Sequence, residues 1–425
     1  MKLNYKRTFF VGLAFLSICA FWQLYDSIIP LILKNTFQID HTWSGVIMAL
    51  DNVLALFLLP LFGTLSDKTN TRLGRRTPYI LFGTIGAVIF MLLIPVADHL
   101  VRPILFFLAL MATLLFMSTY RSPAVALMPD LTPKPLRSKA NAVINLMGAV
   151  GSVISLALIA VLVPKSEKPD YFPIYAIVAG LMLLSVLVLV LTIREKKLAG
   201  EVAAIETLET SDEPAAESDE KMPRDVRKSL ILILISVTMW YMGYNAVTTS
   251  FSKYAQDYLQ IEGGGFASLM MVATVAAVLS YLPVGFLATR IGRKKTILIG
   301  VALLFVSFGA AFAFTRYHWF MIVLFILTGI GWASINVNSY PMVVEMAKGS
   351  DVGRYTGYYY AFSMAAQILT PILSGFLLQY VGYWTLFPYA VLFVTIAFCT
   401  MCGVRHGDSR PVLPKDKLEM LDVEE

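Results

Sequence analysis

Twelve apolar segments constrain this chain more than any other feature of its sequence. A helix needs about 20 consecutive apolar residues to cross the hydrocarbon core of a bilayer, and each segment reaches that length. Only 15% of the residues are charged, which is too few to cover the surface of a soluble protein of this size. We therefore predict an all-α integral membrane protein with twelve transmembrane helices. The segments are residues 8–33, 44–65, 78–97, 102–128, 139–163, 171–193, 229–252, 265–288, 296–315, 318–344, 355–380 and 383–404.

One long polar segment, residues 194–228, divides the twelve spans into two sets of six. It is rich in Glu, Ala, Ser and Pro, a composition typical of a solvated linker. We expect a six-helix bundle over residues 1–193, a cytoplasmic linker over 194–228, a second six-helix bundle over 229–404 and a cytoplasmic tail over 405–425.

The distribution of basic residues predicts the orientation. With the N-terminus in the cytoplasm, most of the 34 lysines and arginines fall in cytoplasmic segments, as positive-inside topology requires. Both termini are then cytoplasmic, and Trp43, Trp319 and Trp384 each begin a span from the outer side. The first apolar run is too long for a signal peptide, so we interpret it as a retained helix of a multi-pass protein in a bacterial cell membrane.

The two halves repeat a short loop motif. GTLSDKTNTRLGRR, at residues 63–76, resembles GFLATRIGRKK, at residues 285–295. After removal of four residues, Gly63 aligns with Gly285, Gly74 with Gly292 and Arg75 with Arg293. A parallel repeat of six helices suggests two pseudo-symmetric bundles that move against each other around a central site.

These loops have the composition of a cytoplasmic latch. Glycine permits a tight turn, and Asp67 can bond Arg72 or Arg76 or cap a helix N-terminus. The alternative is that the basic residues only anchor the loops on the cytoplasmic side. A second acid–base repeat follows each fourth span, in PDLTPKPLR and in EMAKGSDVGR. The predicted latch residues are Gly63, Asp67, Arg72, Gly74, Arg75, Arg76, Asp130, Arg137, Glu345 and Arg354.

The loop motif G-x-L-S-D-K…R-x-G-R-R resembles the signature of the major facilitator superfamily, and twelve spans with a central linker extend that resemblance over the whole chain. DKTNTRLGRRTPY (67–79) and ALMPDLT (126–132) resemble sucrose-transporter-like proteins, which neighbour the glycoside–pentoside–hexuronide cation symporters. The resemblance implies the major facilitator fold, sugar uptake coupled to a cation, usually a proton, and a cavity lined by the first and fourth helices of each bundle.

One departure bears on the coupling ion. Melibiose-type sodium symporters carry aspartates shortly before the proline of the second helix, whereas Pro60 here follows Leu58 and Leu59. A hard cation needs several oxygen ligands, which these side chains lack. This departure argues against sodium coupling, and we predict no metal site.

Charged residues inside the spans mark the candidate proton site. Asp26 and Asp51 lie at similar depth, about seven residues from the outer ends of neighbouring helices, or about 10 Å. Two close carboxylates in a low dielectric repel each other, so one could hold a proton near neutral pH. Either acid could instead make a structural hydrogen bond. Arg121 lies about seven residues from the inner end of its span, so a direct pair with the acids is doubtful; it could bind substrate oxygens, pair with an acid in one state or extend toward the inner surface.

Aromatic and amide side chains share faces of the same helices. Trp22 stands four residues before Asp26, and Trp332 four before Asn336, spacings that place both residues on one helix face. A ring can cover the C–H face of a sugar while an amide bonds its hydroxyls, although aromatic residues in membrane helices often only pack. The predicted substrate residues are Trp22, Gln23, Tyr25, Tyr120, Arg121, Asn145, Trp240, Tyr244, Asn245, Trp332, Asn336 and Gln367.

Together these patterns predict a secondary active transporter. We expect proton-coupled symport of a neutral sugar or glycoside, sucrose-like or maltose-like, by alternating access; the alternative is a proton-coupled antiporter that exports amphiphilic drugs. A membrane sensor is less consistent with the short linker and tail. We predict no enzyme, because no nucleophile–base set or phosphate loop occurs, and no cofactor. The expected partners are a small-molecule substrate, protons and the bilayer, with no nucleic acid, around a monomer.

Overall fold

The computed structural model describes residues 3–133, 136–166, 168–209, 223–346 and 352–408. These residues form thirteen α-helices and a short 3-10 helix, and the described ranges contain no β-strand. Twelve of the helices are long and apolar enough to cross a membrane, which confirms the predicted number of spans. The predicted linker and tail lie partly outside the described residues, at 210–222 and 409–425.

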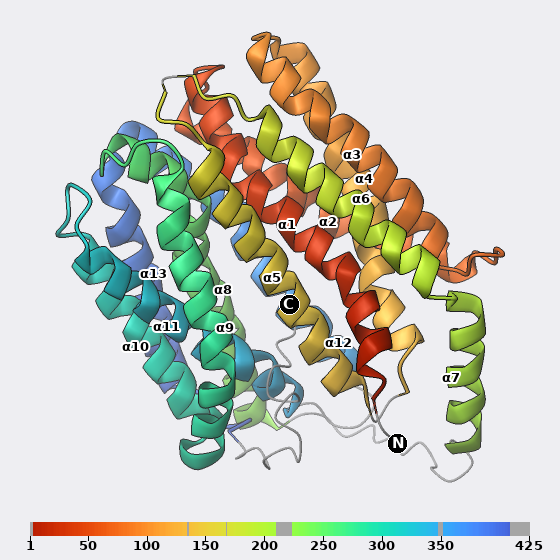
Figure 1. Cartoon of the computed structure of the whole chain (residues 1–425). Coiled ribbons are helices and arrows are strands. Elements are labelled where there is room, and N and C mark those ends of the chain that lie inside the picture. The colour runs from red at the N-terminus through yellow and green to blue at the C-terminus, as the bar shows by residue number, and fades with distance from the viewer. Residues whose placement is uncertain (1–2, 134–135, 167, 210–222, 347–351, 409–425) are drawn as a thin grey trace. The chain divides into compact units, whose positions relative to one another are not determined.

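The helices group into two compact units (Figure 1). Unit 1 holds the first six spans and a short helix that follows them: α1 (Tyr5–Asn35), α2 (His41–Lys68), α3 (Thr77–His99), α4 (Pro103–Asp130), α5 (Arg137–Leu162), α6 (Phe172–Thr192) and α7 (Glu195–Glu209). Unit 2 holds the other six spans: α8 (Arg224–Asp257), α9 (Gly265–Ile291), α10 (Arg293–Ala311), α11 (Phe320–Val344), α12 (Val352–Tyr380), the 3-10 helix η4 (Tyr383–Thr385) and α13 (Leu386–Cys402).

Two short segments group with the opposite half of the chain. Ile39–Ala49, which includes the first turns of α2, belongs to unit 2, and Gly263–Ala267, at the start of α9, belongs to unit 1. Within unit 2, the backbone N–H of His41 donates to Gln379 Oε1 on α12 at 3.1 Å. The second helix of each set of six therefore divides between the units, which the expected boundaries did not include.

Proline sets the start of several spans. Prolines lie in the first turn of α3, α4 and α6, where the missing N–H costs nothing because the first helical N–H groups have no partner within the helix. Asn4 instead caps α1, with its side chain accepting from the backbone N–H of Arg7 at 3.1 Å. These local signals agree with the predicted starts of the helices.

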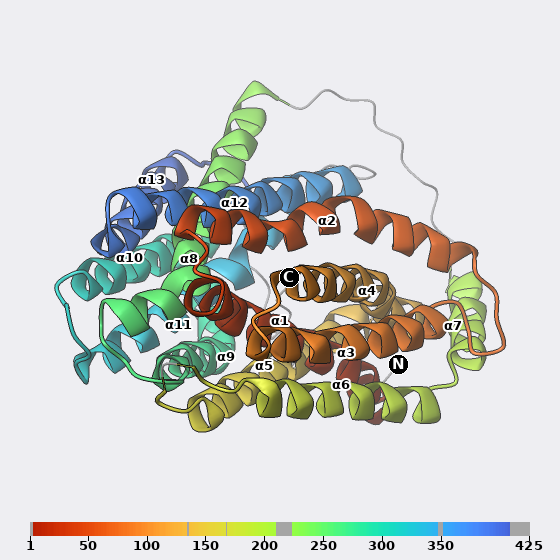
Figure 2. The same cartoon turned by 90° about the horizontal axis from the view of Figure 1, so that it is seen from above.

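Both units pack their helices by the same scheme. In unit 1, α1 contacts α5 and α6, while α3 contacts α4 and α6. In unit 2, α8 contacts α12 and α13, while α10 contacts α11 and α13, and Figure 2 shows α12 and α13 beside α8. Each of these helix pairs in unit 1 has a counterpart in unit 2 whose labels are higher by seven, so that α1 corresponds to α8 and α3 to α10. The difference is seven and not six because α7 lies between the two sets of spans. The loop repeat seen in the sequence is thus part of a repeat of whole helix packing.

Candidate functional site

The charged residues of the unit 1 interior lie close enough to interact. Asp26 on α1 interacts electrostatically with Asp51 on α2 and with Arg121 on α4, and Asp51 also interacts with Arg121. The side chain of Asn52 donates from Nδ2 to Asp51 Oδ1 at 2.8 Å. Three helices therefore bring two carboxylates and one guanidinium into one cluster, which we call the acid–guanidinium cluster.

Arg121 lies beside Trp22. Its Cζ is over the ring of Trp22, 5.6 Å from the ring centroid, and Trp22 is one helical turn before Asp26 on α1. A long flexible side chain can place its charged group well away from its own Cα. A guanidinium over an indole face is a favourable cation–π contact.

Two residues of α1 complete the surroundings of the cluster. Tyr25 is only 2% exposed, and its hydroxyl interacts electrostatically with both Asp51 and Asp26. The ring of Trp22 packs against Tyr25, with 5.5 Å between their centroids and an interplanar angle of 84°. Gln23 is half-buried and donates from Nε2 to Ser27 Oγ at 3.2 Å, so part of its hydrogen-bonding capacity is used within α1.

Several buried donors of unit 1 lack a partner. Trp22 Nε1 and Asn145 Nδ2 are buried and have no hydrogen-bond partner in the part of the chain that the structure describes. The great majority of buried polar groups in proteins are paired, so such exceptions call for an explanation. A ligand with hydroxyl groups would supply the missing acceptors.

Tyr120 is the predicted site residue of unit 1 whose structure favours packing. Its side chain is fully buried, and its hydroxyl donates to the Ala14 carbonyl at 2.8 Å and contacts Ser17 Oγ. All three groups join α4 to α1. A hydroxyl committed to these partners has little capacity left for a substrate.

Unit 2 offers aromatic rings in place of charges. Tyr244 on α8 stacks on Trp332 of α11, with centroids 3.7 Å apart and planes within 5° of parallel. Tyr241 meets the same indole edge-on, at 5.2 Å and 87°. Nearby on α8, Asn245 Nδ2 is buried and has no hydrogen-bond partner within the described residues. We call Tyr241, Tyr244, Asn245 and Trp332 the aromatic–amide cluster.

The structure distinguishes two adjacent aromatic residues of α8. Trp240, the predicted one, is fully buried, and its Nε1 has no hydrogen-bond partner within the described residues; Tyr241, which was not among the predicted site residues, joins the aromatic–amide cluster. The sequence did carry a signal for Tyr241, because it stands four residues before Asn245 and so shares its face. The other two predicted residues of unit 2, Asn336 on α11 and Gln367 on α12, are half-buried.

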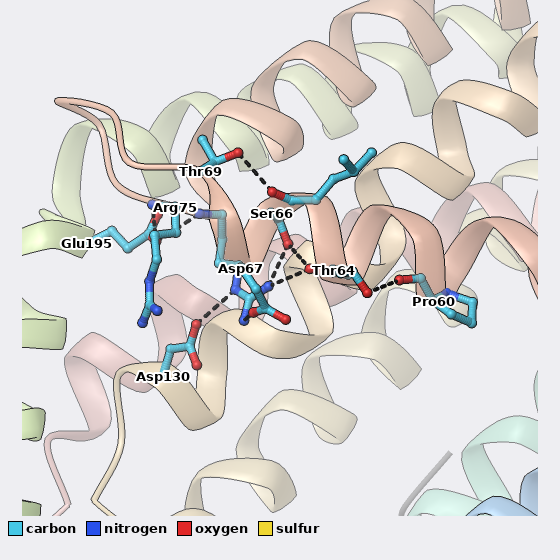
Figure 3. A network of polar contacts seen from close by, with 11 residues as sticks. Pro60, Thr64, Ser66, Asp67, Thr69, Arg75, Asp130 and Glu195 are labelled. Carbon is cyan, nitrogen blue, oxygen red and sulfur yellow. Dashed lines mark hydrogen bonds and ion pairs between the residues drawn. The ribbon is translucent and has the colours of Figure 1, made fainter.

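The predicted latch of unit 1 centres on Arg76, and Figure 3 shows Ser66, Asp67 and Asp130, three of the residues that contact it. Its guanidinium pairs with Asp67 and donates from Nε to Asp130 Oδ2 at 2.8 Å. It also donates to Ser66 Oγ and to the Gly63 carbonyl. The side chain of Arg76 is 6% exposed, so a buried cation has its positive charge matched by acids from the ends of α2 and α4.

The other basic residues of this latch play smaller parts. Arg72 and Arg75 are exposed, and Arg75 contributes its backbone N–H rather than its side chain. Arg137 donates from Nε to the Thr132 carbonyl at 3.1 Å, which ties the start of α5 to the loop before it. Of the two arginines that Asp67 was expected to reach, Arg76 is the one with a salt bridge.

Sequence analysis missed the residue that holds this loop from behind. Glu195, the first residue of α7, is 2% exposed. Its Oε1 accepts from the backbone N–H groups of Arg75 and Arg76, and its Oε2 accepts from the backbone N–H and hydroxyl of Thr77, all within 2.6–2.8 Å (Figure 3). A carboxylate at the first turn of α3 satisfies unpaired donors and favours the helix dipole.

Gly74 is required by this arrangement. Its φ is +123°, and a Cβ at this position would overlap the Glu195 side chain. Only glycine adopts such a backbone conformation without strain. The latch of unit 1 therefore combines the Gly74 turn, a loop backbone bound by Glu195 and the buried Arg76.

Unit 2 contains a reduced version of the same arrangement. Arg293 pairs with Glu345, as Arg76 pairs with Asp130. Gly292 has φ +93°, and Asp408 Oδ1 accepts from the backbone N–H of Lys294 at 2.8 Å, as Glu195 does in unit 1. The sequence alignment matched Arg293 with Arg75, but the pairing matches it with Arg76, one residue later.

Arg354 makes contacts within its own helix. Its Nε donates to the Tyr358 hydroxyl at 2.9 Å, and its Cζ lies 5.6 Å from the Tyr358 ring centroid. Both residues belong to α12. Glu345 therefore has its salt bridge with Arg293, at the start of α10, rather than with the arginine that follows it in the sequence.

Comparisons with known proteins agree with this architecture. The family described as MFS/sugar transport protein matches residues 11–404. An isoprimeverose transporter from Lactiplantibacillus pentosus is 21% identical over 67% of this chain and 60% of its own length. The sucrose transport protein SUC3 from Arabidopsis thaliana is 26% identical over 36% of this chain and 28% of its own length. The chain thus spans less than two thirds of these curated relatives.

Solved structures share the fold at low sequence identity. The nucleoside transporter NupG is 16% identical, with a TM-score of 0.68 over 95% of this chain and all of that one. A bacterial homologue of the iron transporter ferroportin is 13% identical, with a TM-score of 0.67 over 94% of this chain and 99% of that one. The family match, twelve spans and repeated helix packing lead to one conclusion: the chain belongs to the MFS/sugar transport protein family, whose members are transporters and not enzymes.

Proposed function

We propose that this protein is a proton-coupled symporter that takes up a neutral sugar or glycoside, sucrose-like or maltose-like, by alternating access. The observation that carries the proposal is the acid–guanidinium cluster of unit 1, in which Asp26, Asp51 and Arg121 interact beside Trp22. Two carboxylates near one guanidinium carry one net negative charge, and a single proton makes the cluster neutral. A cluster of this kind can bind and release one proton in each transport cycle.

The unpaired donors support a hydroxyl-bearing substrate. Trp22 Nε1, Asn145 Nδ2 and Asn245 Nδ2 are buried donors with no acceptor among the described residues. Sugar hydroxyls accept such hydrogen bonds, and aromatic rings such as Trp22 and Trp332 cover the apolar faces of sugar rings. The matching family and the sugars named for its relatives agree with this substrate class.

The experiment is sugar uptake into proteoliposomes that contain the purified full-length protein. Radiolabelled sucrose, maltose and isoprimeverose are offered at two pH values, and the external pH is recorded in vesicles without an imposed gradient. We expect uptake of at least one sugar to be faster at the lower external pH, because the cluster must be protonated from outside, and to make the external medium more alkaline.

Asp26→Asn tests the coupling, and Asp98→Asn is its matched control. Asp98 is also a buried acid of unit 1, but it accepts a hydrogen bond from Thr36 away from the cluster. We expect Asp26→Asn to abolish the alkalinisation and Asp98→Asn to keep it. Sugar uptake that is indifferent to pH and to both cluster aspartates would refute proton coupling, and transport of lipophilic cations without sugars would favour the exporter.

A further inference from the structure

The two aspartates of the acid–guanidinium cluster have different hydrogen-bond partners. Asp51 Oδ1 accepts from the side-chain amide of Asn52 at 2.8 Å. The interactions of Asp26 that the structure describes are with charges: it is repelled by Asp51 and attracted by Arg121. The pair is therefore asymmetric, although both residues are aspartates at neighbouring places.

Hydrogen-bond donors stabilise a carboxylate, whereas a nearby like charge destabilises it. Asp51 has the side-chain donor of Asn52 in addition to the attraction of Arg121, whereas, within the described residues, Asp26 has the attraction of Arg121 alone. The repulsion between the two carboxylates is mutual and favours neither. When one proton binds to the pair, it binds more favourably to the acid whose carboxylate form is stabilised less by its surroundings. We infer that Asn52 is a positioning residue that keeps Asp51 ionised and thereby assigns the transported proton to Asp26.

The remaining groups around the pair do not alter this assignment. The hydroxyl of Tyr25, on α1, interacts with both aspartates, and Tyr175, on α6, interacts with Tyr25. Tyrosine is uncharged near neutral pH and is not a competing acid there. Arg121, from α4, attracts both carboxylates and so favours neither by its charge alone. The amide of Asn52 is then the polar group that distinguishes them.

This inference rests on the proposed proton coupling but can be tested without any substrate. Protonated carboxyl groups have an infrared C=O stretching band that carboxylates lack. The spectrum is recorded at neutral pH for the full-length protein in lipid nanodiscs, as differences between wild-type protein and variants. The variants are Asp26→Asn, Asp51→Asn, Asn52→Leu and the double variant Asp26→Asn with Asn52→Leu.

Asp26→Asn should lose one protonated-carboxyl band, because Asp51 stays ionised beside Asn52 and Arg121. The double variant should regain a band, since Asp51 then lacks its side-chain donor and takes the proton. Asp26→Leu, which adds no amide to the site, should lose the same band if the asparagine variant folds poorly. Asn338→Leu is the control, because this buried amide of unit 2 donates to the Ser334 carbonyl and its removal should leave the band unchanged.

Persistence of the band in both Asp26 variants would overturn the inference, because the proton would then belong to Asp51. Failure of Asn52→Leu to restore a band in the Asp26→Asn background would show that the amide does not decide the assignment. Neither result depends on sugar uptake. Absence of sugar-driven alkalinisation together with the expected bands would instead refute the proposed proton-coupled sugar transport and leave Asp26 as the protonated acid of the pair.

Discussion

Unit 1 and unit 2 arrange their helices by the same contacts, yet they differ in the kind of residue that lines their interiors. In unit 1, α1, α2 and α4 contribute Asp26, Asp51 and Arg121. In unit 2, the corresponding α8 and α11 contribute Tyr244 and Trp332. A duplicated scaffold thus carries ionisable chemistry in one copy and aromatic chemistry in the other, so helix packing alone does not specify what a unit can bind.

The latch loops of the two units also differ, in the number of polar partners around the arginine. In unit 1, Arg76 has two acids, a hydroxyl and a carbonyl around it. In unit 2, Arg293 has a salt bridge with Glu345, and the position that aligns with Asp67 is Thr289. The unit 1 latch is the more completely bonded one, and the following substitutions test that difference.

The largest effect is expected for Arg76→Ala. Removing one partner of a buried ion pair leaves the others uncompensated, which costs about 3 kcal/mol. Arg293→Ala should cost less, about 1 kcal/mol, because Glu345 is 29% exposed and water can take over its solvation. Thermal unfolding of the detergent-solubilised protein measures both. Arg75→Ala is the matched control, because Arg75 contributes only its backbone N–H to the latch. Equal losses of stability in Arg76→Ala and Arg293→Ala would show that the two latches do not differ in strength.

The acids that bind the loop backbone give the next contrast. Glu195→Ala leaves three backbone donors, those of Arg75, Arg76 and Thr77, without their acceptor, and two of the three are buried. We expect a loss of about 2 kcal/mol in the free energy of unfolding. Asp408→Ala removes an exposed acceptor. Water can take its place, so we expect the free energy of unfolding to fall by only about 0.5 kcal/mol. Amide hydrogen exchange should report faster exchange at the start of α3 in the first variant. Unchanged protection there would contradict the capping role of Glu195.

A third contrast separates binding from coupling. Trp332→Leu removes the ring that stacks on Tyr244, and we expect sugar affinity to fall about tenfold, or 1.4 kcal/mol. The pH dependence of uptake should stay as in the wild type, because the acids lie in unit 1. Trp319→Leu, at an indole that is 64% exposed, is the control for loss of a tryptophan. A shifted pH profile in Trp332→Leu would mean that unit 2 takes part in proton coupling.

The smallest effect is expected for Asp67→Thr, which copies the residue of unit 2 into unit 1. The Asp67 side chain is 56% exposed, and an ion pair with so much solvent contributes about 0.5 kcal/mol. Asp130→Asn should cost more because that carboxylate is 21% exposed. Thermal unfolding again measures both losses. A larger loss for Asp67→Thr than for Asp130→Asn would mean that Asp67, and not Asp130, is the main partner of Arg76.

Sequence analysis predicted the spans well because apolar length is a local property. A charge inside a span is visible without knowledge of the fold, so Asp26 and Asp51 could be proposed as site residues from the sequence. The sequence could not rank Arg76 above Arg75, because neighbours of the same type differ only in the direction in which the fold points them. Sequence analysis missed Glu195, whose partners lie 118–120 residues earlier.

The sequence by itself determined the membrane class, the number of spans and the repeat, because each rests on runs of residues that act over one helix or one loop. The tertiary structure decided which charges meet. Arg121 lies over Trp22 and interacts electrostatically with both aspartates, and Glu195 binds the backbone of Arg75, Arg76 and Thr77, which lie more than a hundred residues earlier in the chain. Such contacts depend on how helices distant in sequence pack together, and this packing cannot be deduced from spacing along the chain.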